Sequence, residues 1–282
     1  HHLMCYVDSN GEARKKDAAD PGPGYSCLSG PGVPISGDLG IWTPGNDPVR
    51  LPEGVARSLP RGSDIILQPH YHPTGKPEVD RTRVGLHFAR TPIKRTVLWN
   101  AATDLHMRLP AGDPNIVVRG AWPIPVDVEA LAVFPHMHGL GRDIAMSLTF
   151  PDGRSLDLLK IEDWDPALQN TYYFEKPLDI PKGSILNVVA HFDNTAANPR
   201  NPNHPPTDVF WGEAITEEMC NGFLFMTKKG QDLTRPGERD DLSEIFARQP
   251  EDYRNIRKAE RRRRELEAAS GGPGTKDGSR IR

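Results

Sequence analysis

Apolar residues gather in short runs along the chain, separated by polar segments that contain glycine and proline. The runs are rich in Val, Ile, Leu and aromatic residues, a composition typical of β-strands. They cover residues 3–7, 64–70, 84–89, 116–121, 130–138, 144–150, 156–161, 185–192 and 222–226. The pattern predicts an all-β protein built from sandwiches of short antiparallel strands.

The turns between these runs share a formula, an apolar residue followed by Pro-x-Gly. Proline presets φ and glycine accepts a positive φ, as tight turns require. The formula occurs at residues 51–54, 59–62, 109–112 and 180–183. In the second and fourth cases a histidine followed by an aromatic residue, His70 or His191, stands eight positions after the glycine. This spacing indicates a weak internal repeat of two similar β domains, although common turn chemistry before a strand is the alternative.

We therefore expect a first domain over residues 1–97 and a second over 98–228, with the boundary inside 90–104. The character changes from Lys228 onward, and residues 229–282 form a third segment. Charged residues with loosely helical apolar spacing predict a solvated helix over 240–269. The basic run at 261–264 is flanked by glutamates, and the Gly-rich end at 270–282 predicts disorder.

Composition excludes some classes of function. The 282 residues carry 35 Lys and Arg against 38 Asp and Glu, a formal net charge of −3. This balance argues against a globally basic nucleic-acid binder and gives no general attraction to anionic membranes. No apolar run reaches the roughly 18 residues of a spanning helix, so we predict no transmembrane segment in this stretch.

The three cysteines are too few for a disulfide scaffold. Cys5 and Cys27 are the local candidates for one disulfide, and Cys220 would then be an unpaired thiol. The number of cysteines therefore does not show whether the protein works in an oxidising or a reducing compartment. The chain opens with His1-His2 rather than Met, which we interpret as a fragment or processed product. The lack of a leader here therefore says nothing about export.

Histidines are the main candidates for chemistry. Ten are present, and close sets occur at His1-His2, His70-x-His72 and His136-x-His138. Residues i and i+2 of a strand share a face, so His136 and His138 can point into one site. Two imidazoles leave a metal under-coordinated, and a third ligand must come from elsewhere. An ordinary hydrogen-bonded histidine pair remains the alternative.

The residues near this pair narrow the choice of metal. A cupin-like site expects a Glu soon after the second histidine, but only Asp143 follows. A zinc hydrolase wants a nearby Glu as general base, and none stands beside the pair. A His-Met copper site remains, with Met219 as the candidate thioether, although a methionine is usually core packing. A single-metal hydrolase stays as a rival.

Four ordered motifs resemble the copper type II, ascorbate-dependent monooxygenases and, in further segments, their bacterial branch. The motifs are His1-His2-Leu3-Met4, Gln68-Pro69-His70-Tyr71, His136-Met137-His138-Gly139-Leu140-Gly141 and Glu218-Met219-Cys220-Asn221. The resemblance covers about residues 1–227. Each motif is weak alone, but four in order at plausible separations are specific.

The resemblance implies two jelly-roll-like β-sandwiches, of which the first is incomplete at its N-terminus. It implies one copper ion in each, the first held by His1, His2 and His70 and the second by His136, His138 and Met219. Ascorbate would be the reductant and O2 the oxidant for hydroxylation of a C–H bond. Gln68 would help position the electron path and Asn221 is the family's asparagine, so both are candidate catalytic residues.

Departures from the family bear on the substrate. Phe134 stands where the peptide-hydroxylating branch has an Arg that grips the peptide carboxylate, and Phe223 stands where it has a Tyr. These changes disfavour peptide amidation and favour a small or apolar substrate. The resemblance also implies a periplasmic or secreted protein and a missing N-terminal module. A non-catalytic copper-binding or interaction module derived from the same fold is the alternative function.

Overall fold

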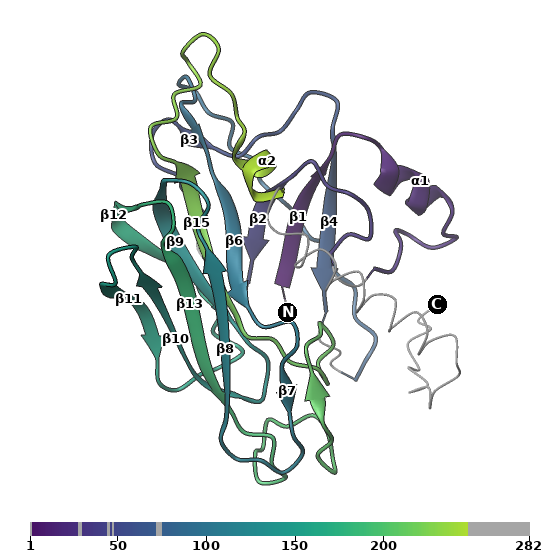
Figure 1. Cartoon of the computed structure of the whole chain (residues 1–282). Helices are drawn as coiled ribbons and strands as arrows, with labels where there is room; N and C mark the ends of the chain where they lie inside the picture. The colour runs from purple at the N-terminus through teal and green to yellow at the C-terminus, as the bar shows by residue number, and fades with distance from the viewer. Residues whose placement is uncertain (1, 28–29, 44–45, 47, 72–74, 248–282) are drawn as a thin grey trace.

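The computed structural model describes residues 2–27, 30–43, 46, 48–71 and 75–247. These residues contain fifteen strands and two short helices. The expected all-β class is confirmed (Figure 1). The first elements are β1 (His2–Asp8), α1 (Glu12–Ala18), β2 (Gly37–Trp42), β3 (Val55–Ala56), β4 (Asp64–His70) and β5 (Arg95–Thr96). The others are β6 (Leu98–Thr103), β7 (Arg108–Leu109), β8 (Ile116–Pro123), β9 (Val128–His136), β10 (Gly141–Thr149), β11 (Ser155–Ile161), β12 (Tyr172–Ile180), β13 (Ile185–Phe192), β14 (Val209–Phe210), β15 (Asn221–Lys228) and α2 (Leu242–Ala247).

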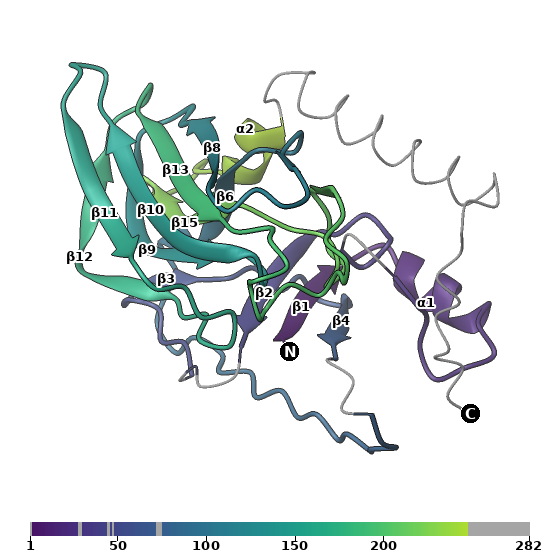
Figure 2. The same ribbon diagram turned by 90° about the horizontal axis from the view of Figure 1, so that it is seen from below.

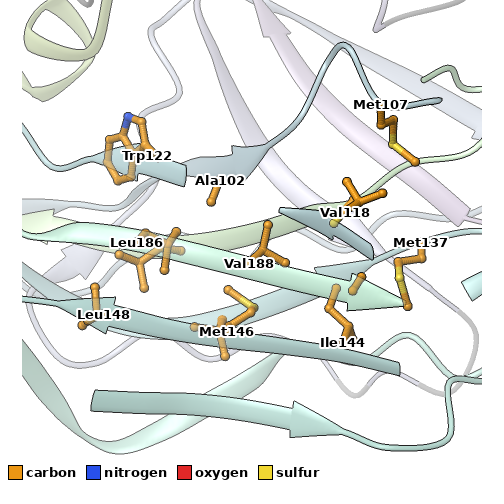
Figure 3. Close-up of a cluster of buried hydrophobic side chains, with 14 of the residues drawn as sticks. Ala102, Met107, Val118, Trp122, Met137, Ile144, Met146, Leu148, Leu186 and Val188 are labelled. Carbon is orange, nitrogen blue, oxygen red and sulfur yellow. The ribbon is translucent and has the colours of Figure 1, made fainter. Parts of the chain in front are cut away.

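Two four-stranded antiparallel sheets pack face to face in the second part of the chain. Their strand orders are β11-β10-β13-β8 and β12-β9-β15-β6. Strict alternation of buried and exposed residues along β8 turns one face inward, as a half-buried strand requires. Figure 3 shows the resulting core, in which Met146 and Leu148 of β10 lie beside Leu186 and Val188 of β13.

The first part of the chain forms a three-stranded sheet in the order β2-β1-β4. Directly paired residues share a face, and Cys5 pairs with Leu67 whereas His2 pairs with His70. Because successive side chains point to opposite faces, His2, Met4, Gln68 and His70 lie on one side and Cys5 lies on the other.

This arrangement keeps Cys5 and Cys27 apart. The Gln68 amide donates to the Cys27 sulfur at 3.1 Å, so Cys27 lies on the Gln68 side of the sheet, away from the side of Cys5. All three cysteines are free, and the candidate bridge between Cys5 and Cys27 is not formed.

Most predicted strands appear within a few residues of their expected bounds, with two clear differences. The run at 84–89 was expected to be a strand, and the structure places it in an extended segment outside every sheet, so that prediction is wrong. The second difference is β9, which ends at His136, so that His138 follows the strand instead of sharing its face. The sequence pattern also did not predict α1, the strands β2, β6 and β12, or the two-residue strands β3, β5, β7 and β14.

The predicted charged helix is seen only at its start. The helix α2 runs from Leu242 to Ala247, and the rest of the expected helix and tail lies outside the described residues. Neither helix in the described ranges has the length and apolar character needed to cross a bilayer.

Close approach of the two sheets of the sandwich gives a stability prediction at Gly120. A Cβ at this position of β8 would lie 2.6 Å from the backbone nitrogen of Thr103 on β6. Backbone cannot rotate away as a side chain can, so Gly120→Ala should destabilise the fold by about 1–3 kcal/mol, as overpacking does. Urea denaturation followed by circular dichroism measures the change.

The matched control is Gly85→Ala, because a Cβ on Gly85 meets nothing within 4 Å. This control should unfold at the urea concentration of the unchanged protein. Equal midpoints for the two variants would contradict the close packing of β6 on β8.

Candidate metal centre

Five of the six predicted metal ligands line one cavity of about 1460 Å³. It is bordered by the first sheet on one side and by β6, β9 and β15 on the other. The five are His2, His70, His136, His138 and Met219. The sixth, His1, and the nearby His72 lie outside the described residues.

The buried carboxylate of Glu218 joins the two segments that carry His138 and Met219. It accepts hydrogen bonds from the backbone N–H of His138 at 2.8 Å, of Leu140 at 2.7 Å and of Met219 at 2.9 Å. Burial raises the pKa of Glu218, while the charge of His138 and the backbone donors act in the opposite direction. The three donors satisfy a group that would otherwise be costly to bury.

Hydrogen bonds fix which nitrogen of each imidazole carries the proton. The His138 Nδ1 lies 2.9 Å from the backbone oxygen of Glu217, and a carbonyl oxygen can only accept. The His136 Nδ1 lies 2.5 Å from the Gln169 Oε1, whose own amide nitrogen donates to the Pro166 oxygen. Both Nδ1 atoms therefore carry hydrogen, which leaves the Nε2 lone pairs as the metal-binding positions.

Electrostatics keep the His136 ring neutral. Burial first, and then the charge of His138, lower the pKa of His136 to about 3. A neutral imidazole is the form that binds a metal, so the ring is ready as a ligand at neutral pH.

The Met219 thioether lies at the same end of the sandwich. Met219 is 7% exposed, and the Asn221 amide donates to its sulfur at 3.3 Å. Asn221 pairs directly with His136 across β15 and β9. The sulfur is thus held by a residue whose strand neighbour is one of the two imidazoles.

His2 and His70 form a second pair on the first sheet. They are direct partners across β1 and β4, with ring centroids 4.7 Å apart. Burial and the charge of His70 lower the pKa of His2 to about 4, and His138 contributes as well. His2 and His70 in turn lower the pKa of His136, so the two pairs lie within electrostatic reach of each other.

Gln68 also lines the cavity, on the His70 face of β4. Its amide donates to the Gly30 oxygen at 2.9 Å in addition to the Cys27 sulfur. These contacts hold the loop that contains Cys27 against the first sheet.

An aromatic wall, defined as Phe134, Phe223 and Trp99, continues from the histidines across β9, β15 and β6. Phe134 stacks on His136 with centroids 6.2 Å apart, and Phe223 lies 5.7 Å from Phe134 and 5.1 Å from Trp99. All three line the cavity, so its surface beside His136 is apolar.

Sequence reasoning missed two residues that position the site. Glu218 belongs to a quoted motif, but a buried acid with three backbone donors could not be read from it. Gln169 is 3% exposed and lies in the loop before β12, 33 residues after His136, with no periodicity to mark it. His191 does not join the site: its Nδ1 contacts Asp143 at 2.6 Å on the far sheet.

The chemistry of the donors fits copper. Within the described ranges, no group of three or more His, Cys, Asp and Glu side chains could hold a metal ion. The candidate set here has only two such side chains, the imidazoles of His136 and His138, and its third donor is the Met219 thioether. A soft thioether sulfur favours Cu(I). The residues at this end of the cavity therefore fit a copper ion better than zinc, calcium or magnesium.

Two oriented imidazoles and a thioether, placed at an apolar cavity of a β-sandwich, are the ligand set of a copper site. Residues 122–233 match the family model described as "Copper type II ascorbate-dependent monooxygenase, C-terminal domain". Over these residues the match confirms the recognition made from the sequence motifs, and this part of the chain is similar to the C-terminal domain of that family.

Comparison with solved structures adds nothing to this assignment. The chain is similar to VP2 of infectious bursal disease virus in a subviral particle, with 12% identity over 59% of this chain and 42% of that chain. It is also similar to a structure of the Gt strain of that virus, with 11% identity over 81% and 53%. The chain thus spans about half the length of these structures, and both TM-scores are 0.26, too low to support any argument. A search of curated proteins finds no match.

The depressed pKa of His136 predicts acid sensitivity of the metal-free protein. Below pH 6.5 the unfolded chain gains a proton on this residue, whereas the folded protein gains it only near pH 3. Stability from the neutral ring is therefore complete above pH 6.5 and is lost as the pH falls, by at most about 1.4 kcal/mol per unit. His136→Phe should lose less stability than the unchanged protein between pH 7 and pH 5, as measured by melting temperature.

The exposed His87 provides the matched control, since His87→Phe makes the same change away from the cavity. This control should keep the original pH profile. The same profile in His136→Phe would show that the ring does not resist protonation in the folded state.

Proposed function

We propose that this protein is a copper-dependent monooxygenase that hydroxylates a C–H bond of a small or apolar substrate, using O2 and a reductant such as ascorbate. One observation carries the proposal: the Met219 thioether and the His136 and His138 rings line one cavity, within a region that matches the monooxygenase family. The free Nε2 atoms of both rings and the apolar wall beside them support it.

Two copper ions are proposed, one for each set of ligands. His136, His138 and Met219 would hold the first, and His1, His2 and His70 would hold the second. Bound copper would supply the activation of O2 and the transfer of electrons. Two imidazoles and a thioether leave a coordination position open, whereas three imidazoles suit an ion that changes oxidation state.

The residues of the chain orient the ligands and select the substrate. Gln169 and the Glu217 carbonyl hold the two rings with their Nε2 atoms free. The aromatic wall offers an apolar surface without a charged anchor, because Phe134 and Phe223 replace the Arg and Tyr of the peptide-hydroxylating branch. Apolar contacts there would exclude water and hold a C–H bond close to the metal.

Asn221 and Gln68 are assigned supporting roles. Asn221 would hold the Met219 sulfur through its amide, which is within hydrogen-bonding distance. Gln68 would position the path between the two copper ions, since it lines the cavity beside His70. Both residues are proposed to act close to the copper ions.

The wider organisation follows the same family. The proposal includes jelly-roll-like domains at 1–97 and 98–228, a charged segment at 229–282, and a periplasmic or secreted location. The start of β6 at Leu98, in the sheet that carries His136, supports the first boundary.

Removal of the thioether tests the proposal directly. In Met219→Leu, copper-loaded protein should lose ascorbate-driven O2 uptake by at least about tenfold, because leucine keeps the volume but cannot bind copper. Copper content, measured by mass spectrometry after dialysis, should fall from about two ions toward one. Isotopically labelled O2 should place one labelled atom in the product formed by the unchanged protein.

Met226→Leu is the matched control, because Met226 is a fully buried core methionine of β15 that does not line the cavity. This variant should keep both copper ions and the O2 uptake. Copper binding without O2 uptake across a broad substrate panel would favour the non-catalytic module, and restoration of activity by zinc would favour a hydrolase.

Removal of the Gln169 side chain, which contacts the His136 Nδ1, gives an independent prediction. Gln169→Leu frees the His136 Nδ1 and removes the group that orients the ring, so copper affinity should fall about 10–100-fold. Competition with a colorimetric copper chelator measures the affinity.

The control is Gln231→Leu, which removes another buried glutamine, one that binds the Thr96 backbone away from the cavity. Gln231→Leu should lower stability and leave copper affinity unchanged. Equal affinities in the two variants would contradict the role assigned to Gln169.

A further inference from the structure

Residues 75–92 form an extended segment that lies outside every sheet and is exposed at each position. Figure 2 shows it as the blue stretch at the lower edge of the molecule, apart from the labelled strands. Within it, Val84, Leu86 and Phe88 alternate with polar or small residues and are 38%, 38% and 73% exposed. Soluble proteins seldom expose such a row of large apolar side chains unless the row binds something.

The pattern is that of a half-buried strand. Apolar residues with a period of two place Val84, Leu86 and Phe88 on one face, and the extended backbone is already in the conformation that a sheet requires. The strand lacks a neighbour among the described residues, since none of the sheets in those ranges includes it.

The outer strands of the first sheet expose apolar side chains as well. Trp42 of β2 pairs with Leu3, and Leu67 and Ile65 of β4 pair with Cys5 and Val7, so these side chains share one face. Trp42, Leu67 and Ile65 are 49%, 41% and 38% exposed. Leu3, Cys5 and Val7 of the central strand β1 lie on this face and are 9%, 8% and 0% exposed, so only the outer strands leave apolar side chains uncovered.

The charge of this segment indicates which kind of strand can pair with it. Residues 81–90 contain Arg81, Arg83 and Arg90 and no acidic residue, a formal charge of +3. A second copy of the segment would bring six arginines together, and like charges on facing strands are destabilising. A strand with acidic residues at alternate positions would instead place them on the side of Arg81 and Arg83 and its apolar side chains beside Val84, Leu86 and Phe88.

We propose that residues 84–89 are a docking strand that binds an acidic, strand-forming segment of another polypeptide by β-strand addition. Backbone hydrogen bonds would provide affinity, and alternate side chains would provide selectivity. The inference is independent of the metal centre, since no residue of this segment lines the cavity.

A binding experiment with the full chain tests the proposal. The probe is a fluorescent ten-residue peptide in which valine alternates with glutamate, and the matched probe has lysine in place of glutamate. The acidic peptide should bind at least about tenfold more tightly in fluorescence anisotropy, an advantage that salt reduces. Hydrogen exchange of the backbone amides of residues 84–89 should slow when the acidic peptide is bound.

Variants locate the binding site. Leu86→Asp with Phe88→Asp should weaken binding of the acidic peptide at least about tenfold and leave the melting temperature unchanged, because both side chains are exposed. Val117→Asp makes the same change at an exposed position of β8 and should bind like the unchanged protein. Equal binding of the two peptides, binding that survives the double substitution, or self-association through this segment in sedimentation would each overturn the proposal.

Discussion

The hydrogen bonds of the buried Glu218 carboxylate hold the candidate metal centre together. His138 follows the end of β9 and Met219 precedes the start of β15, so strand pairing alone does not fix either residue. Glu218 accepts from the backbone of both, and from Leu140, and so joins two segments 80 residues apart. Because the carboxylate is fully buried, loss of these donors together would leave a costly unpaired group, so the two segments stabilise each other.

Strand register supplies the rest of the geometry. Pairing of Asn221 with His136 places the amide that contacts the Met219 sulfur beside one imidazole. Pairing of Phe223 with Phe134, the next partners on the same face, starts the aromatic wall. A slip of one residue would turn both faces over, so the buried face of the sandwich and the cavity depend on the same register.

The sequence predicted the strands and the candidate ligands better than their surroundings. Ordered motifs single out His136, His138 and Met219 as candidate ligands, and the structure places all three at one cavity. Gln169 was missed because a loop residue is brought to His136 by tertiary structure and follows no period. The run at 84–89 has a strand's alternation, but alternation specifies an amphipathic strand and not its neighbour.

The position of the His136 ring depends on both parts of the chain. Thr43, from the segment after β2, donates its hydroxyl to the Gln169 backbone oxygen, and the Gln169 side chain holds the His136 Nδ1. Thr43 and Gln169 are 4% and 3% exposed, so loss of the Thr43 hydroxyl would leave the buried Gln169 backbone oxygen without this donor. The first sheet therefore does more than present His2 and His70 to the cavity, because the segment after β2 also holds the loop that orients an imidazole of the sandwich.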